Sequence, residues 1–240
     1  MCLYRLVRFM PVALVAGLAG TVANADIVFT ENQTGGNNGT ISYAGNAQPN
    51  PLIGHNLQIN GLYCDNCPQN ANDVNNVIPV NGILNFTSGL PVPPTKAGNF
   101  AFGGNGPGHP GTSFEIDGTI PTLNINTTTQ LLTGTFQLAI VDPSTATLGG
   151  NFVSITLDVG PDSKDPDILS HFGLPSNTEF SFSARFFAAP FTPGTDDSFS
   201  IQPFRGTVTN AIIPEPSFTW LLAASGVAGI AVCRKLRAAA

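Results

Sequence analysis

The sequence predicts an all-β fold, an antiparallel β-sandwich or jelly roll, for the central part of this chain. Two features predict strands: short runs of alternating apolar and polar residues, and clusters of Asn, Gly, Pro and Asp between the runs. A third feature argues against helices, because no apolar repeat of helical period extends over three turns before residue 217. Roughly eight to ten short strands at this spacing are typical of a sandwich or jelly roll.

In the first half of the chain, the expected strands are separated by long polar segments. Residues 32–39 form an Asn- and Gly-rich turn that predicts a hairpin between the first two strands. Residues 45–77 are rich in Asn and are expected to be mainly loop, and residues 89–111 are rich in Pro and Gly and are expected to be irregular. The strands expected here lie at 26–30, 40–44, near 57–59 and at 82–87.

The second half of the chain shows clearer alternation. Phe114 and Ile116 fall on one face of their run, as do Phe180 and Phe182 of a later one. We expect these residues, together with Phe136 and Phe152, to fill the core. A helical turn is indicated at 167–172. The strands expected here lie at 113–117, 131–141, 152–159, 178–187, 198–204 and 206–212.

The first 25 residues have the three parts of a secretory signal peptide. Arg5 and Arg8 supply the positive region, residues 9–22 the apolar region, and Ala23-Asn24-Ala25 a small-residue cleavage site. Cleavage is therefore expected between Ala25 and Asp26, which leaves residues 26–213 as the secreted domain. An uncleaved signal anchor is the alternative.

The last 27 residues, 214–240, also have three parts in order. Pro214-Glu215-Pro216 comes first, then an uncharged apolar run of 16 residues, 218–233, and then the basic residues Arg234, Lys235 and Arg237. The run is shorter than the roughly 20 residues of a comfortable span, but basic side chains can extend to the headgroups. It predicts a short transmembrane helix in the inner membrane, with the basic cluster on the cytoplasmic side. A buried C-terminal helix is the alternative.

This end of the chain resembles the PEP-CTERM sorting signal of Gram-negative bacteria. The resemblance covers the Pro-Glu-Pro motif, the short hydrophobic helix and the basic tail. It implies recognition by a membrane-embedded exosortase, cleavage near Pro214-Glu215-Pro216, and release or re-attachment of the upstream domain at the cell surface. Such signals typically occur in organisms that make exopolysaccharide, so an exopolysaccharide or biofilm matrix is the implied setting.

The charge of the secreted domain excludes some partners. Residues 26–213 contain 14 of the 15 acidic residues but only four of the nine basic ones, which gives a net charge of −10. Such a domain repels nucleic acid and anionic lipid. No cofactor motif is present: the Gly-rich run at 103–108 is followed by neither Lys-Ser/Thr nor a helix, so it is not a phosphate-binding loop.

Cys64 and Cys67 are the only cysteines of the secreted domain. In an exported protein such a pair predicts a short-loop disulfide. The Asn- and Pro-rich flanks do not favour the helix N-terminus that a redox-active thiol uses. A zinc site would need His55, His109 and His171 to converge, so free thiols, redox activity and metal binding are alternatives.

Two acidic clusters could carry chemistry. Glu115 and Asp117 share one face of a strand, and the surrounding residues resemble part of the Glu-Ile-Asp-x-Glu signature of retaining jelly-roll glucanases, in which the first Glu is the nucleophile. Positions 119 and 120 are Thr and Ile, so the general acid of that signature is missing. Asp162, Asp165 and Asp167 are weak Ca²⁺ candidates, but they lack the spacing of an EF-hand loop.

These observations favour a non-enzymatic, exported surface or matrix protein. A carbohydrate- or Ca²⁺-dependent adhesion module on the same scaffold is the second hypothesis, and a glycoside hydrolase using Glu115 is the third. The aromatic content counts against the second hypothesis, because the secreted domain has no Trp and only Tyr43 and Tyr63, whereas sugar-binding surfaces often use exposed Trp or Tyr.

Overall fold

The computed structural model describes residues 25–32, 39–46, 50–68, 77–94, 98–103, 112–147 and 150–213. Residues Asn24–Ile213 form one compact unit. The predicted signal peptide before Ala25, the Pro-Glu-Pro motif, the apolar run 218–233 and the basic cluster all lie outside the described residues. Within the ranges described, no helix is both long enough and apolar enough to cross a membrane.

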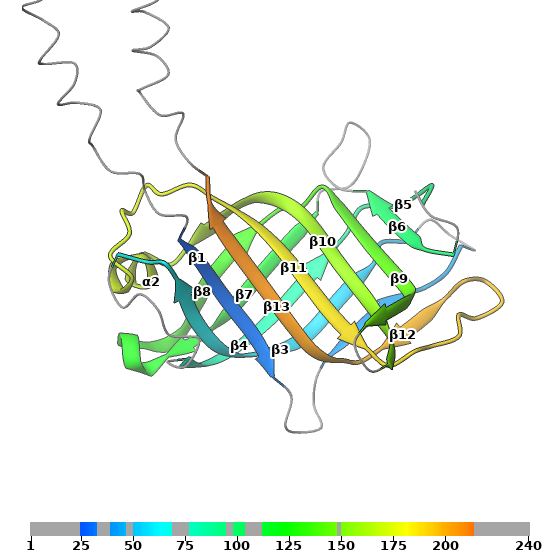
Figure 1. The fold of residues 1–240 in the computed structure, drawn as a ribbon, viewed down its shortest axis with the longest axis horizontal. Helices are drawn as coiled ribbons and strands as arrows, with labels where there is room; N and C mark the ends of the chain where they lie inside the picture. Colours follow the sequence, from blue (N-terminus) through cyan, green and yellow to red (C-terminus); the bar gives the residue numbers. More distant parts are fainter. Residues whose placement is uncertain are drawn as a thin grey trace, which may run out of the picture. The chain divides into compact units, whose positions relative to one another are not determined.

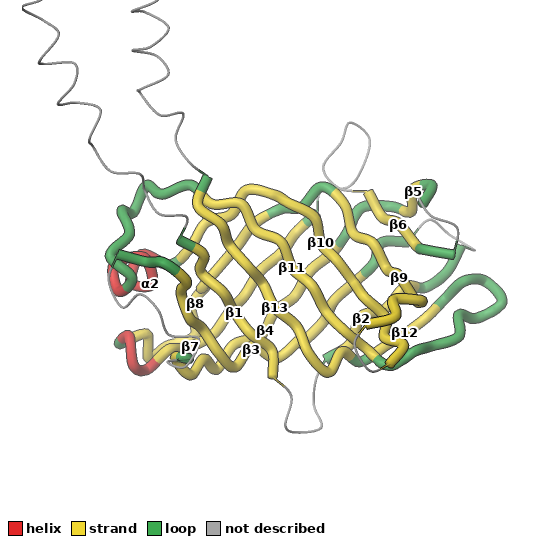
Figure 2. Tube along the Cα trace, viewed as in Figure 1, coloured by secondary structure: helices red, strands yellow, loops and turns green. Residues whose placement is uncertain are grey.

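The described part of the chain is almost entirely antiparallel β structure (Figures 1 and 2). One short helix, α2 (Pro166–His171), and one 3-10 turn, η1 (Pro121–Leu123), accompany the strands. The strands are β1 (Asp26–Asn32), β2 (Thr40–Tyr43), β3 (Ile53–Asp65), β4 (Ile78–Thr87), β5 (Pro91–Val92), β6 (Phe100–Gly103), β7 (Ser113–Ile120), β8 (Ile125–Gly134), β9 (Leu138–Thr147), β10 (Gly150–Lys164), β11 (Phe180–Ala188), β12 (Phe199–Ile201) and β13 (Pro203–Ile212).

Eight of the strands close into a barrel. Their order around the barrel is β11, β13, β1, β3, β4, β7, β8 and β10, and β10 pairs with β11 to complete the circle. The expectation of an all-β antiparallel fold is confirmed, but the sheet closes on itself instead of forming two stacked layers. The long strand β10 closes the circle because residues 153–162 pair with β11 and residues 162–164 pair with β8.

The first strands are connected differently from the predicted hairpin. β1 pairs with β13 and β3, whereas β2 pairs with β3 and β12, so β1 and β2 do not form a hairpin. The expected loop 45–77 is also wrong in part, because β3 extends over Ile53–Asp65. Its Asn and Gly residues suggested a loop, but Leu57, Ile59 and Leu62 are buried.

Phenylalanine rings from different walls fill the barrel interior. Phe114 of β7 stacks on Phe182 of β11 with ring centroids 4.4 Å apart. The ring of Phe86 in β4 packs against Phe136 and Phe186, with distances between ring centroids of 6.2 and 6.1 Å. The predicted core positions Phe114, Phe136, Phe180 and Phe182 are confirmed as buried; the side chain of Phe152 lies outside the description.

Two strands of the barrel are continued by other strands after a break. Gly134 of β8 lies opposite Asp162, and Leu138 of β9 lies opposite Asp158, so three residues lie between the two pairs on each side. β8 and β9 therefore follow one line along β10, interrupted at 135–137. In the same way, β4 ends at Thr87 and the chain resumes pairing at Pro91 in β5.

Buried hydroxyl groups satisfy the backbone at these breaks. Ser88 Oγ accepts from Leu52 N at 2.7 Å and donates to Gly89 O at 2.7 Å. Thr112 Oγ1 accepts from Phe136 N at 3.1 Å and donates to Phe136 O at 2.8 Å. Because buried backbone groups must be paired, these bonds allow strands to break inside the fold. β5, β6 and β9 then continue beyond the barrel at the end away from α2 (Figure 2).

Candidate functional site

The carboxylates predicted from the glucanase-like motif lie on the outer face of β7. Phe114 and Ile116 point into the barrel, so Glu115 and Asp117 alternate to the opposite face. A hydrogen bond with Asp117 raises the pKa of Glu115, and burial and the negative charge of Asp117 add to the rise, against a weaker bond from Gln130. Neither Glu115 nor Asp117 lines the pocket described below.

The aspartates proposed as Ca²⁺ ligands do not come together. Asp162 points into the barrel and forms a buried ion pair with Lys164. Asp165 caps α2 by accepting from Asp167 N at 2.9 Å. Asp162 lies in β10, whereas Asp165 and Asp167 lie at the start of α2, and in the described ranges no three His, Cys, Asp or Glu side chains gather as metal ligands do. The prediction that Asp162, Asp165 and Asp167 could together bind one Ca²⁺ ion is therefore wrong.

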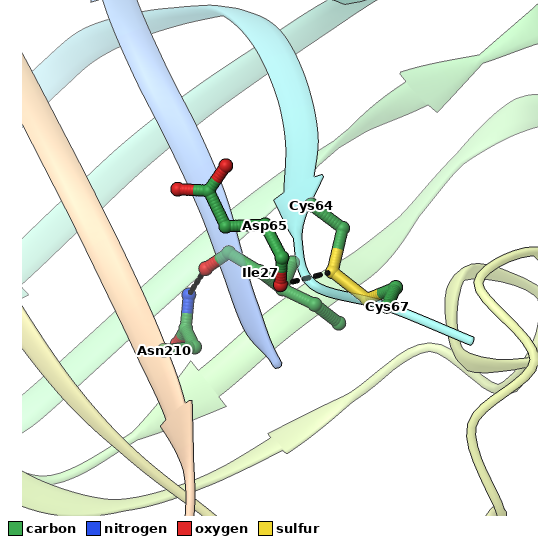
Figure 3. Close-up of a disulfide and its surroundings, with 5 residues drawn as sticks. All are labelled: Ile27, Cys64, Asp65, Cys67 and Asn210. Atoms are coloured by element: carbon green, nitrogen blue, oxygen red, sulfur yellow. Dashed lines mark hydrogen bonds between the residues drawn. A yellow bond between two sulfur atoms is a disulfide. The ribbon is translucent and has the colours of Figure 1, made fainter. Parts of the chain in front are cut away.

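Cys64 and Cys67 form a disulfide at the end of β3, with their Cα atoms 5.9 Å apart (Figure 3). Both are buried in the core. Nearby, Asn210 Nδ2 of β13 donates to Ile27 O of β1 at 2.9 Å, and Cys64 Sγ approaches Asp65 O at 3.5 Å. The disulfide therefore closes a turn beside the strands that carry both ends of the domain.

A pocket of about 300 Å³ is lined by residues of β2, β5 and β6, strands that lie at the end of the fold away from α2 (Figure 2). One side is formed by β5, β6 and the residues around them, with Pro91, Val92, Pro94, Phe100 and Phe102 supplying apolar surface. The other side comes from β2 and from the loop before β12. Three segments far apart in the sequence therefore build this pocket.

An aromatic cluster holds the two sides together. The Tyr43 ring packs edge-on against Phe102 with centroids 4.9 Å apart, and Phe199 of β12 lies 5.3 Å from Phe100. Tyr43 and Phe102 are only 3% and 1% exposed, so their rings form the base of the pocket and not its open surface. Such aromatic contacts stabilise the packing beyond the area they bury.

A chain of hydrogen bonds crosses the polar side. Tyr43 Oη donates to Asn46 Oδ1 at 2.5 Å, and Asn46 Nδ2 donates to Asp197 Oδ2 at 2.5 Å. Burial raises the pKa of Tyr43, and the negative charges of Asp197 and Asp196 raise it further. The phenol therefore stays protonated at neutral pH and remains a donor to Asn46.

The backbone positions these polar groups. Asn46 N donates to Asp196 O at 2.8 Å, and Gly45, with φ of +94°, leaves room for this contact because a Cβ there would meet Asp196 O at 2.7 Å. Asp196 Oδ1 accepts from the Ser198 hydroxyl and backbone amide, which lowers the pKa of Asp196. Asp197 itself has φ of +66°, an uncommon conformation for a residue with a side chain.

Asn99 also lines this pocket. Asn99 Oδ1 is buried and, among the described residues, has no hydrogen-bond partner. An unpaired buried acceptor is costly to a fold. Of the described residues that line the pocket, only Asp197 is charged.

Tyr43 entered the sequence argument only as one of the two tyrosines of residues 26–213, and Asn46, Asn99 and Asp197 were not predicted to form a site. The available signal was weak: one of two tyrosines, an Asn in an Asn-rich stretch, and an acidic turn. No family model, curated protein or solved structure matches this chain.

Proposed function

We propose that this chain is a non-enzymatic protein that is exported across the inner membrane and sorted to the cell surface or the extracellular matrix. Its signal peptide, residues 1–25, starts export. Its C-terminal segment, residues 214–240, holds the precursor in the membrane until an exosortase processes it. Exopolysaccharide is the proposed surrounding of the finished protein.

One observation about the barrel supports this proposal most directly: the fold begins and ends at the two predicted processing points. β1 starts at Asp26 and pairs with Ala211 near the end of β13. Ile213 N donates to Glu179 O at 2.9 Å, whereas the bond from Ile212 N to Ala25 O, 3.3 Å, would be lost with the signal peptide. Pro214 follows immediately. Cleavage at both points would leave every strand of the barrel intact.

The disulfide and the charge support the same proposal. A Cys64–Cys67 disulfide suits an oxidising compartment outside the cytoplasm. The excess of acidic residues in 26–213 keeps the domain away from anionic lipid, so membrane attachment would depend on the C-terminal segment alone. A glycosidase role for Glu115 is less well supported, because Glu115 lies on the outer face of the barrel and away from the pocket.

The test replaces Arg234, Lys235 and Arg237 together with Gln in the producing cell and measures surface protein by fractionation. We expect the surface fraction to fall several-fold and an unprocessed precursor to accumulate, because the positive stop is lost. Arg205→Gln, an exposed charge of β13, is the matched control and should leave sorting unchanged. Unchanged processing in the triple variant would contradict the proposal.

A further inference from the structure

We propose that the pocket between β2, β6 and the loop before β12 binds a neutral saccharide unit through Asn46, Asn99 and Asp197. This names a ligand class for the surface protein proposed above, but binding by the purified chain does not depend on how the chain is sorted.

The shape of the pocket suits a small ring with one apolar face. Its volume of about 300 Å³ lies at the lower end of small-molecule sites. Pro91, Val92 and Phe100 offer apolar surface on one side, while Asn46 and Asp197 offer polar atoms on the other. A sugar ring is matched to such a site, because its C–H groups cover apolar surface while its hydroxyls make hydrogen bonds.

The hydrogen-bonding groups suit hydroxyls. Asn46 Nδ2 uses one of its two N–H donors on Asp197, which leaves the second for a ligand. Asp197 has further acceptor capacity, and the amide side chain of Asn99 belongs to a residue that also lines the pocket. A hydroxyl both donates and accepts, so neighbouring hydroxyls of one sugar can pair with donors and acceptors placed side by side.

The charge of the pocket selects among ligands. Asp197 and the adjacent Asp196 disfavour phosphates and uronic acids. A small organic cation is bound best by several exposed aromatic faces, and here the rings of Tyr43 and Phe102 are buried, which leaves Phe100 as the one partly exposed ring among the described lining residues. A neutral, hydroxyl-rich ligand remains as the best match.

The polar groups are held in place before a ligand arrives. Tyr43 Oη fixes the Asn46 amide, and the backbone bond from Asn46 N fixes the loop that carries Asp197. Groups that are already oriented lose less conformational entropy on binding, which favours affinity. The left-handed backbone at Asp197 is consistent with a loop kept for its geometry.

The experiment is isothermal titration of the full chain, purified in a detergent without a sugar headgroup. The probes are the methyl glycosides of glucose, galactose and mannose, N-acetylglucosamine, and cellobiose, with galacturonate and choline as charged comparisons. We expect at least one neutral probe to bind. Asn46→Ala and Asp197→Asn should each weaken this binding about tenfold or more, because each removes a ligand hydrogen bond or its charge.

Matched controls are Asn177→Ala and Asp167→Asn, two exposed positions outside the pocket, which should bind as the wild type does. Melting curves show which variants are folded, and Tyr43→Phe provides a milder variant if Asn46→Ala is not. The proposal is overturned if no neutral probe binds at about 10 mM, if only choline or galacturonate binds, or if the pocket variants bind as tightly as the controls. Loss of surface sorting would leave the result unaffected.

Discussion

The molecule contains two polar clusters that each pair an aspartate with a nitrogen donor beside an aromatic ring, and they differ in accessibility. In the barrel, Asp162 and Lys164 form an ion pair whose side chains have no exposed surface, and Lys164 Nζ lies 3.5 Å from the centre of the Phe180 ring. At the pocket, Tyr43, Asn46 and Asp197 form a hydrogen-bonded chain in which Asn46 and Asp197 are exposed. The comparison teaches that access, more than chemistry, separates a group that stabilises a fold from one that can meet a ligand.

Removal of one partner of the buried ion pair is expected to lower the free energy of unfolding more than any other change that we predict. Lys164→Ala leaves the Asp162 carboxylate buried without its partner, and we expect the free energy of unfolding to fall by about 3–5 kcal/mol. Urea titration measures this loss. The double variant Asp162→Asn with Lys164→Met removes both charges and should recover most of the stability. A single variant as stable as the wild type would remove the contrast between the two clusters.

The pH dependence of stability sharpens the same contrast. Burial lowers the pKa of Lys164 to about 8 from 10.5, against the opposing effect of Asp162. Between these values the unfolded chain binds more protons than the folded chain, so stability should rise with pH from about 8 to 10.5. The wild type is compared with the double variant by urea titration, which cancels other titrating groups. If the unfolding free energy of the wild type, relative to that of the double variant, falls between pH 8 and 10.5, the lowered pKa of Lys164 is contradicted.

At the pocket, removal of one hydroxyl should change stability little. Tyr43→Phe keeps the packing on Phe102 and loses only the bond to Asn46 Oδ1, so the cost is expected to be about 1 kcal/mol. Saccharide affinity should fall several-fold, because the Asn46 amide loses its fixed orientation. Parallel thermal melts and titrations measure both quantities. A variant that unfolds as readily as Lys164→Ala would show that the pocket cluster is structural.

Alternation in the sequence was enough to predict the inward faces of the strands. Phe114, Ile116, Phe180 and Phe182 are buried as expected, because a period of two places them on one face. Alternation does not distinguish a barrel from a sandwich, since both bury one face of each strand. Closure depends on the pairing of β10 with β11 and β8, which brings together residues distant in sequence.

The pocket lay beyond sequence reasoning for a similar reason. Tyr43, Asn99 and Asp197 come from three segments, and only the pairing of β2 with β12 and the breaks before β5 and β9 bring them to one place. The aspartates Asp162 and Asp165 show the converse. They are close in sequence, but Asp162 lies in β10 and Asp165 caps α2, so their surroundings differ.

The measurement that tests the contrast most directly is urea unfolding of the wild type and Asn46→Ala, each with and without a saturating neutral saccharide. Without the saccharide, we expect the variant to unfold within about 1 kcal/mol of the wild type. With it, only the wild type should gain stability, because a ligand stabilises the state that binds it. An equal gain in both proteins, or a loss in the variant as large as that of Lys164→Ala, would contradict the assignment of this cluster to ligand binding.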